Sequence, residues 1–267
     1  MINYSFIMKK VLKFILYKIL RLFPRKLLVG YSQSFFDKKD NSFSVKIVRG
    51  FLGECYESGT MDIQKDIGFA LWRSKAATNY LSKRTIPDSV VEKFANVIIN
   101  NPGYDVCEIG AGNGYLIEIL SKKIPGRKFV GVDLNEDQII NDSQRFEGNN
   151  LLKFVCADAV EYVENMIFDK TIFISYISLT TFTPDAVQCL FESISFKKQP
   201  SFLVICEANK SGVADAEKSE LRGNLAYSHN YITIAKKYNF DIISYSTNQE
   251  TGLFWLVCQF GRKKFDN

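Results

Sequence analysis

Short runs of β-branched and apolar residues alternate with stretches of helical periodicity over the second half of the chain. The pattern predicts strands at 104–110, 128–133, 152–158, 170–177, 201–207, 240–248 and 252–263, and helices at 114–124, 135–146, 159–166, 184–194 and 229–240. Successive strands that are separated by helices are expected to run parallel, with helices on both faces of the sheet, because a parallel pair needs a long crossover. The last two strands are joined too closely for a crossover, so we expect an antiparallel hairpin at one edge. The predicted fold is an α/β, doubly wound sheet.

The charges divide the chain into two parts. The 267 residues carry a formal charge of +5, yet no acidic residue precedes Asp37 and the first 36 residues hold seven lysines and arginines. The rest of the chain therefore has a net charge of −2 and lacks the basic stripe of a phosphate-binding surface, so we expect no nucleic-acid partner. We divide the chain into a basic amphipathic helix (1–36), a helical cap or lid region (37–100) and the sheet domain (101–267).

Residues 8–28 form a basic segment with helical periodicity. On a helical wheel most of its lysines and arginines share one half, and its apolar residues share the other. Its longest uninterrupted apolar run, 14–17, is far shorter than a membrane span, and no signal-peptide cleavage pattern follows. Such a helix suits the surface of an anionic membrane. The alternatives are packing on the body of the protein or a contact between two copies, and the oligomeric state is left open.

Six cysteines occur singly, without the paired spacing of zinc, iron–sulfur or thioredoxin-like sites. We therefore expect the protein in a reducing compartment, the cytoplasm. If residues 8–28 bind the membrane, we expect a peripheral protein on its inner face. Four cysteines lie in apolar runs and are expected to be buried as small hydrophobic side chains: Cys107, Cys156, Cys206 and Cys258.

The turn after the first predicted strand suggests a nucleotide site. It reads EIGAGNG, from Glu108 to Gly114, and its glycines allow a tight turn whose backbone approaches a ligand at the start of the next helix. The spacing is GxGxG, whereas dinucleotide sites have GxGxxG, and Tyr115 stands where their third glycine belongs. This departure disfavours NAD.

Two acidic residues end the next two predicted strands. Asp133 lies about 20 residues beyond the glycines, where a carboxylate can accept hydrogen bonds from ribose hydroxyls. Asp158 ends the third strand, where a carboxylate can accept from an exocyclic adenine amine; the alternative is that Asp158 caps the helix that follows. The ends of successive parallel strands lie at one edge of a sheet, so these groups form one constellation.

These motifs resemble the class I S-adenosylmethionine-dependent methyltransferases, whose first motif is ExGxGxG followed by an acid on the second strand. The resemblance covers about residues 90–262 and implies a Rossmann-like seven-stranded sheet with the last strand antiparallel. It also implies S-adenosylmethionine as cofactor, with its methionine and ribose portion at Glu108 and the glycines. Asp133 would hold the ribose, and Asp158 with Ala159 the adenine. Tyr176 would border the methionine end or be simple packing. The expected cofactor-binding residues are Glu108, Gly110, Ala111, Gly112, Gly114, Asp133, Leu134, Asp158, Ala159 and Tyr176.

A hydroxyl acceptor usually requires a base, and His229 is the only histidine in the chain. It follows a long polar connection, 208–228, of a length typical of lids and binding loops. We therefore expect His229 to be the catalytic base; the alternative is a structural hydrogen bond at the start of a helix. The string SHNY at 228–231 resembles sugar O-methyltransferases of bacterial surface polysaccharides. No tight acidic cluster is present, so we expect no metal, although Glu207, Asn209 and Asp185 could supply oxygen ligands.

The predicted function is methylation of a sugar hydroxyl of a surface glycan or lipid-linked polysaccharide at the membrane face, a step of polysaccharide biosynthesis. Amino-methylating enzymes of nucleic acids resemble one another in a [DNS]PP[YF] string, but this chain reads SYIS at 175–178. Methylation of another small molecule or of a protein is an alternative. A further alternative is an inactive cofactor-binding scaffold, against which the intact Glu108, Gly110, Gly112 and Asp133 argue.

Overall fold

The computed structural model describes residues 15, 20, 43–58, 61–223 and 225–261. Their contacts divide the chain into two compact units, residues 1–79 and 80–267. The predicted amphipathic helix at 8–28 lies outside the described residues, apart from Ile15 and Leu20. No described helix is both long enough and apolar enough to cross a bilayer.

The first unit is helical. α4 (Phe43–Ser58) packs against α5 (Met61–Trp72), and α6 (Lys75–Leu81) crosses the division between the two units. The side-chain amide of Gln64 donates a hydrogen bond to the Tyr56 carbonyl at 2.7 Å and ties α5 to α4.

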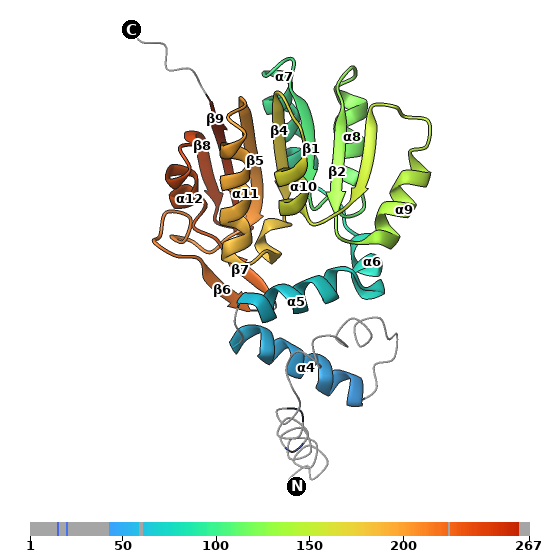
Figure 1. Cartoon of the computed structure of the whole chain (residues 1–267), viewed down its shortest axis with the longest axis vertical. Coiled ribbons are helices and arrows are strands. Elements are labelled where there is room, and N and C mark those ends of the chain that lie inside the picture. The colour runs from blue at the N-terminus through green and yellow to red at the C-terminus, as the bar shows by residue number, and fades with distance from the viewer. Residues whose placement is uncertain (1–14, 16–19, 21–42, 59–60, 224, 262–267) are drawn as a thin grey trace. The chain divides into compact units, whose positions relative to one another are not determined.

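The second unit is built on a seven-stranded sheet with the strand order β3-β2-β1-β4-β5-β9-β8 (Figure 1). Its strands are β1 (Asp105–Ile109), β2 (Phe129–Asp133), β3 (Leu152–Cys156), β4 (Thr171–Tyr176), β5 (Ser201–Ala208), β8 (Asp241–Asn248) and β9 (Leu253–Phe260). The first five run parallel, and β9 runs antiparallel to both β5 and β8. The predicted fold, with a closing hairpin at one edge and the last strand antiparallel, is confirmed.

Helices cover both faces of this sheet. They are α7 (Asp88–Ile99), α8 (Tyr115–Lys123), α9 (Glu136–Arg145), α10 (Ala159–Asn165), α11 (Pro184–Phe196) and α12 (Tyr231–Lys237). One apolar core includes side chains of α10, α11 and α12, and the other includes side chains of α7, α8 and α9. Figure 1 shows α10 and α11 crossing in front of the sheet. α7 falls in the predicted cap or lid region, 37–100, and its buried side chains pack against the sheet.

The strand order reverses between β1 and β4, which pair in parallel as neighbours in the sheet. Open α/β sheets bind ligands at such a switch point, because the loops from neighbouring strands turn away in opposite directions there. The turn from β1 to α8 and the turn after β4 therefore meet at the place where the sequence predicts a cofactor.

Two local features add to the predicted pattern. The connection at 208–228, whose length is typical of lids and binding loops, contains a small hairpin of β6 (Glu220–Gly223) and β7 (Ala226–Ser228). Cys156 is exposed, whereas the other cysteines of the apolar runs are buried. The reason is its place at the end of β3, an edge strand on which buried and exposed side chains alternate in part.

The core beneath α11 gives a prediction about stability. Phe191 is fully buried and meets the Phe240 ring edge-on at 5.3 Å, so Phe191→Ala is expected to lower the free energy of unfolding by about 3–5 kcal/mol. Phe196 lies on the same helix but is 79% exposed. Phe196→Ala should therefore change the free energy of unfolding by less than about 0.5 kcal/mol. Urea unfolding followed by circular dichroism measures both. Equal effects of the two substitutions would contradict this account of the core.

Candidate active site

The turn between β1 and α8 adopts a backbone that side chains rarely allow. Gly110, Gly112 and Gly114 have φ angles of 69°, 57° and 63°, in the left-handed region that glycine enters without strain. At Gly110 space is also lacking, because a Cβ there would lie 1.7 Å from the Ser178 hydroxyl oxygen. At Gly114 a Cβ would lie 2.8 Å from the Phe154 ring. The glycines of the motif are thus required both by conformation and by close packing.

Asp133 links the ends of the first two strands. Its carboxylate accepts hydrogen bonds from the Gly112 amide and from the Asn135 amide, each at 2.9 Å. Burial raises the pKa of Asp133, and these backbone donors act in the opposite direction. Each carboxylate oxygen can accept a second hydrogen bond, so the group can also hold a hydroxyl. Leu134, beside it, is partly buried.

Glu108 lies at the end of β1 and is 3% exposed. The Ile117 amide, in the first turn of α8, donates a hydrogen bond to the Glu108 carboxylate. Glu108 thus caps α8, whose N-cap residue Gly114 has no side chain to do so. The other oxygen, Oε2, has no hydrogen-bond partner among the described residues. Burial, together with the neighbouring Asp133 carboxylate, raises the pKa of Glu108 well above its ordinary value. A buried acid with an unused oxygen beside a glycine turn is a group that a bound ligand can satisfy.

Asp158 caps α10. Its Oδ1 accepts hydrogen bonds from the Val160 amide at 2.7 Å and the Glu161 amide at 3.4 Å. The capping alternative is therefore confirmed, while a contact with adenine stays a prediction. Ala159 begins α10 and is buried.

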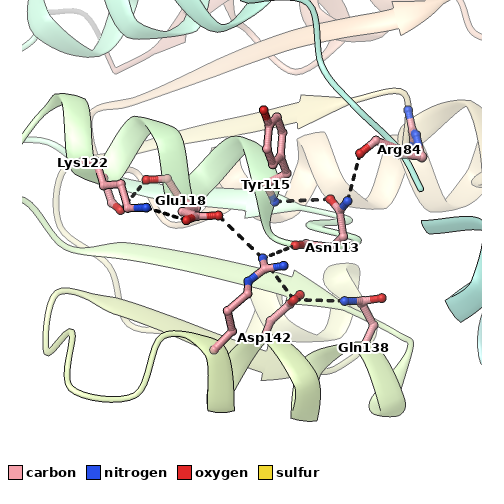
Figure 2. Close-up of polar contacts among 9 residues, drawn as sticks. Arg84, Asn113, Tyr115, Glu118, Lys122, Gln138 and Asp142 are labelled. Carbon is pink, nitrogen blue, oxygen red and sulfur yellow. Dashed lines mark hydrogen bonds and ion pairs between the residues drawn. The ribbon is translucent and has the colours of Figure 1, made fainter. Parts of the chain in front are cut away.

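A polar network braces the outer side of the glycine turn (Figure 2). The Arg145 guanidinium on α9 donates to the Asn113 carbonyl and lies 3.4 Å from Asp142 and 3.8 Å from Glu118. Gln138 donates to Asp142 at 3.0 Å, and burial raises the pKa of Asp142 to about 6. On the other side of the turn, the Asn113 side-chain amide donates to the Arg84 carbonyl at 3.1 Å. The turn is thus held from α9 and from the segment before α7.

The loop after β4 is held by a buried carboxylate. Glu207, on β5, accepts hydrogen bonds from the Ser175 hydroxyl and from the amides of Ser178, Leu179 and Thr180, at 2.8–3.2 Å. The loop begins with Ile177 at a φ of 48°, an uncommon conformation for a β-branched residue, and continues into the 3₁₀ helix η1 (Leu179–Thr181). The Glu207 contacts therefore stabilise a strained loop, and Ser178 of this loop is the residue that packs on Gly110.

His229 lies behind this loop and is fully buried. Its Nε2 is 3.0 Å from the Leu179 carbonyl, which can only accept, so the ring donates there. Its Nδ1 is 3.1 Å from Ser219 Oγ, a hydroxyl that donates to the Asn230 side-chain oxygen at 2.8 Å. Burial lowers the pKa of His229 to about 4. Both nitrogens are engaged, and the Tyr227 and Tyr231 rings lie beside the imidazole. This placement favours the alternative of a structural hydrogen bond over the predicted catalytic base.

The structure brings together most of the predicted cofactor residues. The glycine turn, Glu108 and Asp133 form one contact network, and Tyr176 joins them through Arg84, whose guanidinium lies 5.5 Å from the Tyr176 ring. Arg84 and Ser178 were not predicted as site residues, because neither belongs to a cofactor motif and both reach the turn through the tertiary structure. Glu207 was considered only as a metal ligand. Among the described residues, no group of three or more His, Cys, Asp or Glu side chains could hold a metal ion.

A seven-stranded, doubly wound sheet with the last strand antiparallel, a GxGxG first turn and an acid at the end of the next strand is typical of S-adenosylmethionine-dependent methyltransferases. Residues 100–251 match the profile of a family described as a methyltransferase domain, and the chain belongs to this family. A comparison with curated proteins finds no significant match.

Solved structures share the fold at low identity. A chain from the complex of the Haloferax volcanii Trm112 methyltransferase activator with a methyltransferase has a TM-score of 0.51 and 13% identity, over 72% of this chain and 95% of that one. The methyltransferase domain of bacterial CtHen1 has a TM-score of 0.50 and 13% identity, over 65% and 98%. The [4+2]-cyclase SpnF has a TM-score of 0.50 and 10% identity, over 65% and 80%. The shared architecture therefore does not specify the reaction.

S-adenosylmethionine is the cofactor of this methyltransferase domain. The residues present fit it. Glu108 has a buried oxygen without a hydrogen-bond partner among the described residues, and the backbone of the glycine turn is not covered by side chains of its own. The Asp133 carboxylate can accept further hydrogen bonds, such as those from ribose hydroxyls. When bound, this cofactor supplies an electrophilic methyl group on a sulfonium, so the main task of the protein is to position an acceptor.

The close approach at Gly110 leads to a prediction about cofactor binding. Gly110→Ala places a methyl group against Ser178, so the affinity for S-adenosylhomocysteine, measured by calorimetry, should fall more than about 10-fold. Gly126→Ala is the matched control, since its φ is also positive, at 82°, but nothing lies within 4 Å of its Cβ position. Adding Ser178→Gly to Gly110→Ala should restore part of the affinity. Wild-type affinity in Gly110→Ala would show that the contact does not shape the site.

Proposed function

We propose that the chain transfers a methyl group from S-adenosylmethionine to a hydroxyl group of a polar, sugar-like acceptor, such as a surface glycan or lipid-linked polysaccharide. The observation that carries the proposal is that the glycine turn between β1 and α8 lies beside the loop after β4, which Glu207 holds in place, at the switch point of the sheet. Ser178 touches Gly110, and Glu207 fixes the amides that follow. An acceptor held beside this loop lies near the methionine end of the cofactor, where Tyr176 ends β4.

The connection after β5 supports a polar acceptor. Thr180 of η1 donates to the Tyr227 carbonyl of β7 at 2.8 Å, so the β6–β7 hairpin lies next to the loop after β4. The residues that lead into this hairpin are mostly polar and exposed, among them Lys210, Ser211 and Lys218. Exposed hydroxyl, ammonium and carboxylate groups suit hydrogen bonding to a polyhydroxylated ligand better than contact with an apolar one.

We propose His229 as a positioning residue for this site. Its imidazole donates to the Leu179 carbonyl and so helps to fix η1, while Ser219 fixes the imidazole. A base must reach the proton that it removes, and a fully buried ring with both nitrogens engaged has no such access in this arrangement. Methyl transfer depends strongly on orientation, so fixing the loop contributes to catalysis without proton transfer by His229.

The burial of His229 predicts a specific pH dependence. Because the folded pKa of about 4 lies below the ordinary 6.5, the folded state disfavours protonation, and stability is lost as pH falls from 6.5 towards 4. His229→Gln keeps a donor and an acceptor but does not titrate. Over this range the wild type should lose about 3 kcal/mol more unfolding free energy than the variant, measured by urea unfolding.

The same variant separates positioning from base catalysis. S-adenosylhomocysteine affinity and, with an accepted substrate, most of the turnover should persist in His229→Gln. A loss of turnover of more than about 100-fold with unchanged cofactor affinity would instead identify His229 as the base.

The function itself is tested in two stages. The full chain should bind S-adenosylhomocysteine in calorimetry, and no heat at high micromolar concentration would refute an active cofactor site. Incubation with methyl-labelled cofactor and surface-glycan extracts should then label the glycan fraction, and the label should survive mild alkali, as a sugar methyl ether does and a methyl ester does not. Label in the protein fraction alone would favour the alternative of a protein substrate, and a chain that binds the cofactor but labels nothing would favour a scaffold.

We also propose that residues 8–28 hold the protein on an anionic membrane surface. The support is the charge division, with seven basic and no acidic side chains before Asp37. The full chain should float with phosphatidylglycerol vesicles at low salt and lose much of that binding at high salt. A chain that begins at residue 37 should not float, and equal flotation of the two would show that this segment is not the anchor.

A further inference from the structure

Arg84 is a half-buried cation whose guanidinium forms no ion pair in the part of the chain that the structure describes. It lies in the second unit, in the segment between α6 and α7. Among the described residues, no carboxylate lies within ion-pair distance of its guanidinium and no group accepts a hydrogen bond from it. Arg127 is similarly half-buried, but its guanidinium donates to the Asn101 and Tyr104 carbonyls at 3.0 and 3.3 Å. Arginine carries five donors, so a half-buried one without acceptors is unusual.

The position of Arg84 is fixed by the glycine turn. Its carbonyl accepts from the Asn113 side chain at 3.1 Å, as Figure 2 shows, and its amide donates to the Leu81 carbonyl at 3.0 Å. Leu81 in turn lies 3.2 Å from the position that a Cβ on Gly112 would take. The segment from Leu81 to Arg84 therefore lies directly against the turn that holds the cofactor.

The guanidinium is held near Tyr176. Its Cζ atom lies 5.5 Å from the centre of the Tyr176 ring and 5.9 Å from that of the Tyr80 ring. Such contacts orient a guanidinium through its face and leave the N–H groups at its edge for an acceptor. Tyr176 ends β4, and Glu108, with which Arg84 interacts electrostatically, ends the neighbouring β1. The unused donors therefore lie at the switch point of the sheet.

We infer that Arg84 binds a carboxylate-like anionic group of a ligand at the carboxyl ends of β1 and β4. A guanidinium edge matches a planar carboxylate with two parallel hydrogen bonds. The unused oxygen of Glu108 adds a complementary acceptor for a cationic group nearby. Two sources of the anion are compatible with this chemistry, the methionine carboxylate of the cofactor and an acidic group on the acceptor. The inference rests on the proposed methyl-transfer function.

The test uses the full-length protein and two adenosine ligands. S-adenosylhomocysteine carries the amino-acid carboxylate, and 5′-methylthioadenosine lacks the whole amino-acid portion. If the cofactor supplies the anion, Arg84→Gln should weaken S-adenosylhomocysteine binding about 10- to 100-fold in calorimetry and leave methylthioadenosine binding unchanged. Arg84→Lys should recover part of the loss, because it keeps the charge without the planar edge. Lys83→Gln, which removes a neighbouring exposed charge, should have no effect.

If the acceptor supplies the anion, the S-adenosylhomocysteine affinity of Arg84→Gln should equal that of the wild type. Inorganic phosphate should then raise the thermal midpoint of the S-adenosylhomocysteine-saturated wild type and of Lys83→Gln, but not that of Arg84→Gln. Unchanged affinity together with an identical phosphate response in all three proteins would overturn the inference. Failure of the wild type to bind S-adenosylhomocysteine would refute the methyl-transfer function itself, whereas binding that is indifferent to Arg84 refutes only the role of Arg84.

Discussion

The geometry of the site depends on the close approach between the Gly110 backbone and the Ser178 side chain. Gly110 belongs to the glycine turn between β1 and α8, and Ser178 to the loop that follows β4, so their contact joins two segments that lie far apart in sequence. The contact needs a residue without Cβ at position 110. It also needs a loop that holds Ser178 in place, and Glu207 provides this by accepting hydrogen bonds from the amides around η1. The turn after β1 and the loop after β4 are thereby coupled by packing.

Buried acids shape these loops at a cost in stability. Burial raises the pKa values of Glu108, Asp133, Asp142 and Glu207, which means that the folded protein disfavours their charged forms. Backbone amides offset part of this cost at Asp133 and Glu207, whereas Glu108 keeps one oxygen without a partner. Functional sites retain such unfavourable groups where a ligand or a required loop conformation compensates for them. The unpartnered oxygen of Glu108 is therefore available to a ligand.

Tertiary structure changes the interpretation of several residues that the sequence marks as chemical. A histidine after a long polar connection suggested a base, but the β6–β7 hairpin orders that connection and the ring is buried between η1 and Ser219. Asp158 suggested an adenine contact, and its observed hydrogen bonds cap a helix. In both cases the residue type suits either role. The structure shows the cap that Asp158 forms, and its contact with adenine stays a prediction.

The sequence by itself determined the α/β sheet, the edge hairpin, the glycine turn and the acid on the second strand. These features follow from local periodicity and from spacing within one strand–turn–helix unit, because residues that are close in sequence decide them. The tertiary structure alone decided the contact of Ser178 with Gly110, the support that Glu207 gives to η1, the burial of His229 and the position of Arg84 beside Tyr176. Each of these depends on which strands become neighbours and how closely their loops pack. No short-range pattern encodes such distances, because they arise only when segments far apart in the chain are brought together.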